Sequence, residues 1–246
     1  MLREIHNWYS PSLNKDMELA VYGHYGTAIL LFPTAAADHL EYERFKLIEA
    51  VKPLIDDGRV KLFSIGSVNN ESWLNDSMYP PHKSIKHGQY NQYVIEEVFP
   101  FIFDNCKNRV PIITAGASFG ALHAANTFFR CPDIVRGTIA MSGVYDLKYY
   151  TGGYYDDNVY YNSPIDYLPD LNDVNRLNLM RDNLGVVIAS GQGDYEDPSS
   201  SKYLSEILNS KGIKHWLDLW GHDIKHEWST WLQMLPYFLN ELTKKN

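Results

Sequence analysis

Short apolar runs alternate with amphipathic segments along most of the chain. Residues 27–32 (TAILLF) and 59–66 (RVKLFSIG) have the pattern of strands that are buried on both faces of a sheet. Between them, residues 41–58 show helical spacing of apolar positions and end in a charged turn with glycine. Further strands are predicted at residues 3–10, 17–23, 109–116, 135–143, 184–191 and 213–221. Further helices are predicted at residues 89–105, 119–132, 200–212 and 227–245.

Strands that alternate with helices at this spacing predict parallel strands joined by right-handed crossovers. No linker, repeat or low-complexity tract interrupts the pattern, so residues 1–246 are interpreted as one domain. The expected fold class is α/β, with a mostly parallel central sheet and helices on both faces in a three-layer sandwich. In such sheets ligands bind at the carboxyl ends of the strands, so functional residues are expected in the loops that follow them.

The predicted strand at 109–116 runs directly into the motif GASFG at 116–120, and a helical pattern follows at once. G-x-S-x-G between a strand and a helix is typical of the nucleophile elbow, a sharp turn that lifts a serine hydroxyl above the sheet. The glycines avoid collisions with the neighbouring strand and helix. A free serine hydroxyl is a poor nucleophile, so this geometry is useful only beside a base. Ser118 is therefore the candidate nucleophile, and a plain glycine-rich turn is the alternative.

Two backbone amides are candidates for binding a developing oxyanion. The amide of Phe119 opens the predicted helix, where N–H groups attract anions. The second candidate lies in the loop FPTAAADHLEYE after the strand at 27–32, where small side chains let an amide approach a substrate carbonyl. Ala35 is predicted by its position. The loop can also be interpreted as a short lead into a helix capped by Asp38, and both interpretations are compatible.

The partners of such a serine follow it along the chain in a fixed order, the acid after the next-to-last strand and the histidine after the last. GQGDYEDP follows the strand at 184–191, and GHDIKHEW follows the strand at 213–221. The agreement of three separate segments with this order predicts a Ser-His-acid triad. Two histidines, His222 and His226, compete for the role of base.

Together these motifs resemble the esterase family of α/β-hydrolases that includes esterase D-type enzymes, feruloyl esterase domains and mycolyltransferases. The matching stretches are FPT (32–34), SVNNESW (67–73), GASFG (116–120), SGVYDLKYY (142–150), GGYYDDNVYYNSPIDYLP (152–169), GQGDYED (191–197) and HEWSTW (226–231). They span essentially the whole chain. The resemblance implies the α/β-hydrolase fold and its triad, but it does not specify a substrate.

The resemblance favours His226 as the general base. In this family the catalytic histidine opens an H-[DE]-[FW]-x-x-W stretch, which His226 matches with Trp228 and Trp231 and His222 does not. The two tryptophans also have helical spacing and would anchor His226 at the start of the last helix. His222 is interpreted as a loop residue or a contact in the pocket wall.

Three carboxylates compete for the acid of the triad. Its role is to hold one tautomer of the imidazole and to stabilise the imidazolium, which either Asp or Glu can do. The family pattern, a glycine-rich turn three residues before the acid, favours Glu196. Asp194 remains the alternative, and Asp197 is a further candidate. Those that are not the acid are expected to be solvated turn carboxylates.

Composition narrows the class of protein. The formal net charge of −8 and the lack of a basic run disfavour binding to nucleic acid or to an anionic membrane. Two cysteines, Cys106 and Cys131, and an N-terminus without the pattern of a signal peptide favour a cytoplasmic protein with reduced thiols. The other histidines form no metal-binding motif, so neither a metal nor a cofactor is expected. A tyrosine-rich insertion around 146–170 is expected to form a cap-like pocket wall.

The sequence therefore predicts a serine hydrolase of the carboxylesterase or thioesterase type. Ser118 would attack a small-molecule acyl ester or thioester, His226 would act as base and then acid, and an acyl-enzyme would form and be hydrolysed. Two alternatives stay open: an acyltransferase that uses the same triad, and a protein of this fold that only binds a ligand. Unpaired edge strands and aromatic patches could support a homodimer.

Overall fold

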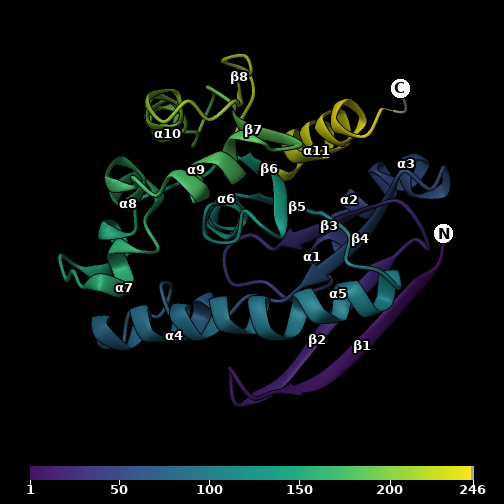
Figure 1. Cartoon of the computed structure of the whole chain (residues 1–246), viewed down its shortest axis with the longest axis horizontal. Coiled ribbons are helices and arrows are strands. Elements are labelled where there is room, and N and C mark those ends of the chain that lie inside the picture. The colour runs from purple at the N-terminus through teal and green to yellow at the C-terminus, as the bar shows by residue number, and fades with distance from the viewer. Residues whose placement is uncertain (245–246) are drawn as a thin grey trace.

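The computed structural model describes residues 1–244 and contains an eight-stranded sheet with the strand order β1-β2-β4-β3-β5-β6-β7-β8 (Figure 1). The strands are β1 (Arg3–Ser10), β2 (Lys15–Tyr22), β3 (Thr27–Phe32), β4 (Val60–Ile65), β5 (Ile112–Ala117), β6 (Val135–Met141), β7 (Gly185–Ser190) and β8 (Trp216–Leu219). Strand β2 pairs antiparallel with β1 and β4, and the other neighbours pair parallel. The predicted mostly parallel α/β sheet is confirmed.

Helices cover both faces of this sheet. The buried residues of α1 (Glu41–Arg44), α2 (Leu47–Ala50), α3 (Lys52–Asp56) and α11 (Trp228–Leu242) form the core on one face. Those of α4 (Pro80–Tyr93), α5 (Phe99–Cys106), α6 (Phe119–Arg130), α8 (Pro164–Asp170), α9 (Val174–Arg181) and α10 (Pro198–Ser210) form the core on the other. In β3 alternate side chains enter the two cores, which explains why its sequence is continuously apolar.

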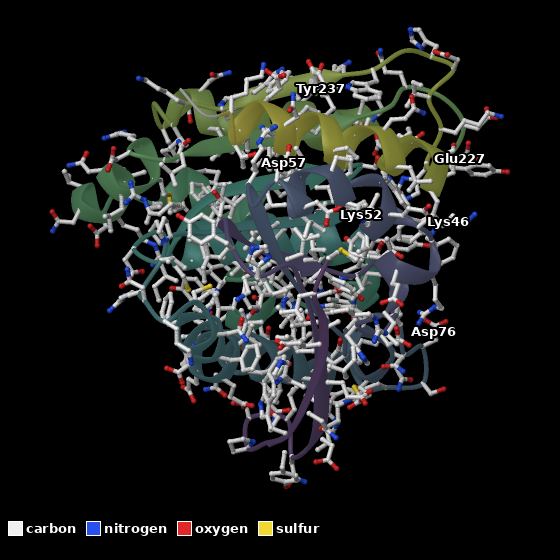
Figure 2. All side chains as sticks on the ribbon, turned by 90° about the vertical axis from the view of Figure 1, so that its right-hand side faces the viewer. Lys46, Lys52, Asp57, Asp76, Glu227 and Tyr237 are labelled. Atoms are coloured by element: carbon white, nitrogen blue, oxygen red, sulfur yellow. The ribbon has the colours of Figure 1, made fainter. Side chains whose placement is uncertain are left out.

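The prediction of one continuous helix over 41–58 is wrong. The segment forms the three short helices α1, α2 and α3, because Lys46 has φ +63° and ends the regular helical hydrogen bonding. The break allows the ring of Phe45 to stack on Trp228 at a centroid distance of 4.2 Å. Figure 2 shows Lys46 beside Glu227 at the start of α11, on the same edge of the molecule.

The helix predicted at 89–105 begins earlier in the structure. Helix α4 starts at Pro80, and a π-helical segment (Val94–Val98) joins it to α5. The first two turns have no apolar helical pattern in the sequence, because their buried side chains are polar: Lys83, Ser84 and His87. The last helix begins at Trp228, and its predicted end at residue 245 lies outside the described residues.

The tyrosine-rich segment at 146–170 contains a 3-10 turn (Lys148–Thr151), α7 (Asp157–Tyr160) and α8. It lies against α4, where Ser84 Oγ donates a hydrogen bond of 2.9 Å to Asp156. Figure 1 shows α7 and α8 together at the end of the molecule where α4 begins. Within residues 1–244, no helix has both the length and the apolar character needed to cross a membrane.

Candidate active site

Ser118 lies in the sharp turn between β5 and α6. Its backbone has φ +55° and ψ −122°, a conformation that L-residues rarely adopt. Close packing requires the flanking glycines, because a Cβ on Gly116 would lie 2.2 Å from the carbonyl oxygen of Gly120. A Cβ on Gly120 would lie 2.3 Å from the carbonyl oxygen of Phe32 at the end of β3. The turn therefore has the geometry that the GASFG motif predicts.

The structure brings His226 to Ser118. His226 follows β8 and precedes α11, and its Nε2 lies 3.0 Å from Ser118 Oγ. Its backbone amide donates to the carbonyl oxygen of Asp194 at 3.1 Å, and its ring packs edge-on against Trp231 at 5.1 Å. The side chain of His226 is 25% exposed, so water can reach the imidazole.

Glu196 lies on the other side of this imidazole. Its Oε2 is 3.5 Å from His226 Nδ1, and its side chain is only 1% exposed. Ser142 Oγ donates to its Oε1 at 2.6 Å, and Ser190 Oγ donates to its Oε2 at 3.1 Å. Burial alone would raise the pKa of Glu196, but the contacts with His226, Ser142 and Ser190 hold this pKa below its ordinary value. Glu196 is therefore an ionised carboxylate at neutral pH.

The competing candidates lie elsewhere. The carboxylate of Asp194 is 66% exposed and pairs with Lys225 at 2.7 Å. The carboxylate of Asp197 caps α10 by accepting from the amide of Ser199 at 3.0 Å. His222 is an exposed residue of the loop between β8 and α11. Of the sequence-predicted side chains, the structure thus brings together those of Ser118, His226 and Glu196.

Two further residues near the acid were missed in the sequence. Ser142, which directly follows β6, has φ +52°, and its hydroxyl accepts from Trp231 Nε1 at 3.0 Å while it donates to Glu196. Ser190 ends β7. Serines at the carboxyl ends of two neighbouring parallel strands were the available signal, because these ends meet at one edge of the sheet.

The amides predicted to bind an oxyanion, those of Phe119 and Ala35, lie in two segments that the fold brings together. Phe119 is the first residue of α6, and the close contact of Gly120 with Phe32 puts the loop after β3 against this helix start. Ala35 has φ +40°. Among residues 1–244, neither amide donates to another protein group. Both N–H groups therefore remain available to a ligand.

Two buried side chains hold the loop that carries Ala35. Glu41 accepts from the amide of Thr34 at 2.7 Å and from its hydroxyl at 2.6 Å. On the other side, Asn69 Nδ2 donates to the carbonyl oxygen of Ala35 at 2.5 Å, and Ser67 Oγ donates to the same oxygen at 3.3 Å. These contacts fix the peptide planes on both sides of the Thr34–Ala35 amide.

Asn69 is itself held by the helix that carries the serine. Its Oδ1 lies 3.1 Å from His123 Nε2, and His123 is a buried residue of α6. Burial lowers the pKa of His123 to about 3, so the ring is neutral at neutral pH and its Nε2–H donates to Asn69. A buried polar chain thus connects α6 to the loop after β3.

The tyrosine-rich segment reaches this site through Tyr150, whose ring packs edge-on against Phe119 at 4.9 Å. The side chain of Lys83 in α4 supports the contact by donating to the carbonyl oxygen of Tyr150 at 3.2 Å. Within the described chain, no three His, Cys, Asp or Glu side chains are grouped as metal ligands. The chemistry available at this edge is therefore that of a serine, an imidazole, a buried carboxylate and two free amides.

No family model matches the sequence, and neither does any curated protein. Solved structures match over nearly the whole chain. A ferulic acid esterase superposes with a TM-score of 0.74 at 17% identity and covers 98% of this chain and 97% of its own. An S-formylglutathione hydrolase from Agrobacterium tumefaciens has a TM-score of 0.72 at 14% identity, with 98% and 94% covered. MPT51 from Mycobacterium tuberculosis has a TM-score of 0.72 at 15% identity, with 99% and 98% covered.

These identities are low, and the likeness lies in the architecture. The superposition extends over nearly the full length of each chain, so it covers the whole eight-stranded sheet and the helices on both of its faces. The chain therefore has the α/β-hydrolase fold.

Proposed function

We propose that the protein is a serine hydrolase that cleaves a small acyl ester or thioester. The observation that carries this proposal is the line of contacts from Ser118 Oγ to His226 Nε2 at 3.0 Å and from His226 Nδ1 to Glu196 Oε2 at 3.5 Å. A serine, a base within hydrogen-bond reach and a third group that orients the base are the recurring parts of an activated nucleophile.

In the proposed mechanism, His226 accepts the proton of Ser118 while Ser118 Oγ attacks the carbonyl carbon. The amides of Phe119 and Ala35 donate to the oxyanion that develops. Glu196 stabilises the imidazolium, which then protonates the leaving alcohol or thiol. A water deprotonated by His226 hydrolyses the acyl-enzyme, and the released proton returns to Ser118. No cofactor takes part in these steps.

Two structural neighbours support this substrate class. Their names describe an esterase for ferulic acid and a hydrolase for S-formylglutathione, an oxygen ester and a thioester respectively. Hydrolysis is favoured over acyl transfer because the imidazole of His226 is one quarter exposed, so water reaches the position of the deacylating nucleophile. A protein that only binds a ligand has no need for a strained serine beside a base, and the structure has both.

A panel of p-nitrophenyl esters of increasing acyl length, together with one thioester, tests this function. We expect saturable release of p-nitrophenol or thiol from at least one short acyl substrate, with none from the heat-unfolded protein. Stoichiometric inactivation by a fluorophosphonate should abolish this release. Release that persists in the fully phosphonylated protein would assign the activity to another site.

The contact between Asn69 and Ala35 gives a prediction about the oxyanion site. Replacing Asn69 by Ala removes the shorter of the two hydrogen bonds to the carbonyl oxygen of Ala35. Loss of an oxyanion donor typically costs 10²- to 10³-fold in kcat, so loosening one should lower kcat by roughly 10- to 100-fold. KM should change little, because the amide of Ala35 is expected to donate to the oxyanion of the transition state and not to the bound substrate.

The neighbouring Asn70 provides a matched control because it is exposed. Asn70→Ala should keep kcat within about twofold, since surface changes usually have small effects. Steady-state hydrolysis of the best substrate in the panel, with kcat and KM separated, measures both variants. Equal kcat values in Asn69→Ala and the wild type would show that the amide of Ala35 is not an oxyanion donor.

A further inference from the structure

A cavity lies at the far end of α6 from Ser118. It has a volume of about 520 Å³, within the range of small-molecule sites, and α4, α7 and α8 contribute to its walls with the end of α6 and the start of α9. Arg130, the last residue of α6, lines it. Arg130 lies twelve positions after Ser118 along this helix, which corresponds to roughly 18 Å along the axis. The cavity is therefore separate from the candidate active site.

The charges in this cavity are not balanced within the protein. Arg130 and Arg176 are its cationic residues, and Asp170 is its acidic residue. Among residues 1–244, the arginines that form ion pairs with carboxylates are Arg3, Arg44 and Arg136. The guanidiniums of Arg130 and Arg176 instead donate to backbone carbonyls. Two positive groups and one negative group leave one net positive charge facing the cavity, in a protein whose net charge is −8.

Both guanidiniums are held in place before any ligand arrives. Arg176 Nη2 donates to the carbonyl oxygens of Phe129 at 3.0 Å and Arg130 at 2.8 Å, at the end of α6. Arg130 Nη1 donates to the carbonyl oxygen of Tyr161 at 3.0 Å. Arg130 Nε is buried and has no hydrogen-bond partner within the described residues. The contacts to backbone carbonyls fix the positions of both guanidiniums in the cavity wall.

Polar side chains that are hydrogen-bonded to one another also line the cavity. Asn162 Oδ1 accepts from Asn91 at 2.7 Å and from Asn126 at 3.0 Å, and Tyr167 OH donates to Asn126 at 2.9 Å. Aromatic and aliphatic groups of Tyr160, Tyr161 and Leu171 also line the cavity. The site therefore combines a fixed positive end with apolar surface, as a ligand with an anionic head and an aromatic body requires.

We propose that this cavity binds a small organic monoanion, an aromatic carboxylate, whose carboxylate lies between Arg130 and Arg176. Guanidiniums match the geometry of carboxylates and form strong charge-assisted hydrogen bonds with them. The single net positive charge fits a monoanion better than a dianion, because Asp170 repels additional negative charge. This binding does not depend on hydrolysis at Ser118.

Isothermal titration of benzoate into the wild type and three variants tests the proposal. Benzoate should bind saturably with one molecule per chain, more tightly than acetate or inorganic phosphate. Arg130→Gln should weaken benzoate binding about tenfold, the usual effect of a lost hydrogen bond to a charged group. Asp170→Asn should strengthen it severalfold, because it removes a negative charge and keeps an oxygen for Tyr160, which donates to Asp170 at 2.9 Å.

Arg109→Gln is the matched control, since this arginine does not line the cavity and instead lies over the ring of Phe103. It should bind benzoate as the wild type does. A folding defect cannot imitate the expected pattern, because two variants of one cavity change the affinity in opposite directions. Unchanged affinity in Arg130→Gln, equal weakening in Arg109→Gln, or absence of saturable benzoate binding would overturn the proposal.

Discussion

Replacing His226 by Ala should reduce kcat/KM by roughly 10⁵- to 10⁶-fold, because removal of the base from a Ser-His-acid triad abolishes activation of the nucleophile. Ser118 Oγ has a hydrogen-bond contact of 3.0 Å with His226 Nε2. No other group in residues 1–244 is placed to accept the serine proton through a side-chain hydrogen bond. Hydrolysis of p-nitrophenyl acetate, corrected for the spontaneous rate, measures the loss.

His222→Ala is the matched control, since His222 is a histidine of the same loop but is exposed. It should keep kcat/KM within about threefold of the wild type, as expected for a surface substitution. The reverse result, a large loss in His222→Ala and near-normal activity in His226→Ala, would show that the loop rearranges and that the sequence motif identified the wrong base.

Glu196→Gln should lower kcat by about 10⁴-fold, the effect seen when the acid of a triad is replaced by its amide. The carboxylate accepts from Ser142 and Ser190 and faces His226 Nδ1. An amide cannot stabilise the imidazolium, and either orientation of it directs an NH₂ group at one of these donors. Because the pKa of Glu196 is held below its ordinary value, the loss should be present throughout the neutral pH range.

Asp194→Asn is the control for the acid. Asp194 contacts His226 through its backbone carbonyl, which the substitution retains, and its exposed carboxylate pairs with Lys225. Exposed ion pairs are worth about 0–1 kcal/mol, so kcat should stay within about threefold of the wild type. Steady-state kinetics of the two variants compare the carboxylates directly. A 10⁴-fold loss in Asp194→Asn with an active Glu196→Gln would assign the acid to Asp194.

Much of the fold follows from local sequence because buried parallel strands and the nucleophile turn have strong local patterns. The run TAILLF contributes to both cores, and the glycines of GASFG are required by contacts within a few residues of Ser118 or with the adjacent β3. The alternation of strands and helices places GQGDYED after the next-to-last strand and GHDIKHEW after the last, where the chain order of such hydrolases predicts the acid and the histidine. These features depend on neighbours along the chain or in the sheet.

The remaining features depend on contacts between distant residues. The break at Lys46 permits the ring of Phe45 to stack on Trp228, and no local sequence pattern predicts this contact. Asp194, Glu196 and Asp197 lie within four positions of one loop. Glu196 is the one that contacts Ser142, which is 54 residues away in the sequence. The hydrogen bond from Asn69 to Ala35 likewise spans 34 residues. Hydrophobic periodicity does not reveal such pairings, so the sequence left alternatives open for the acid and gave no sign of the contacts that hold the loop after β3.

The proposed function depends above all on Ser118 being an activated nucleophile. Incubation of the folded protein with a fluorophosphonate, followed by digestion and mass spectrometry of the peptide that contains GASFG, measures it most directly. We expect one covalent adduct per chain on Ser118, none in Ser118→Ala or in the unfolded protein, and strongly slowed labelling in His226→Ala. A folded wild-type protein that stays unlabelled at Ser118, or that is labelled equally fast without His226, would contradict it.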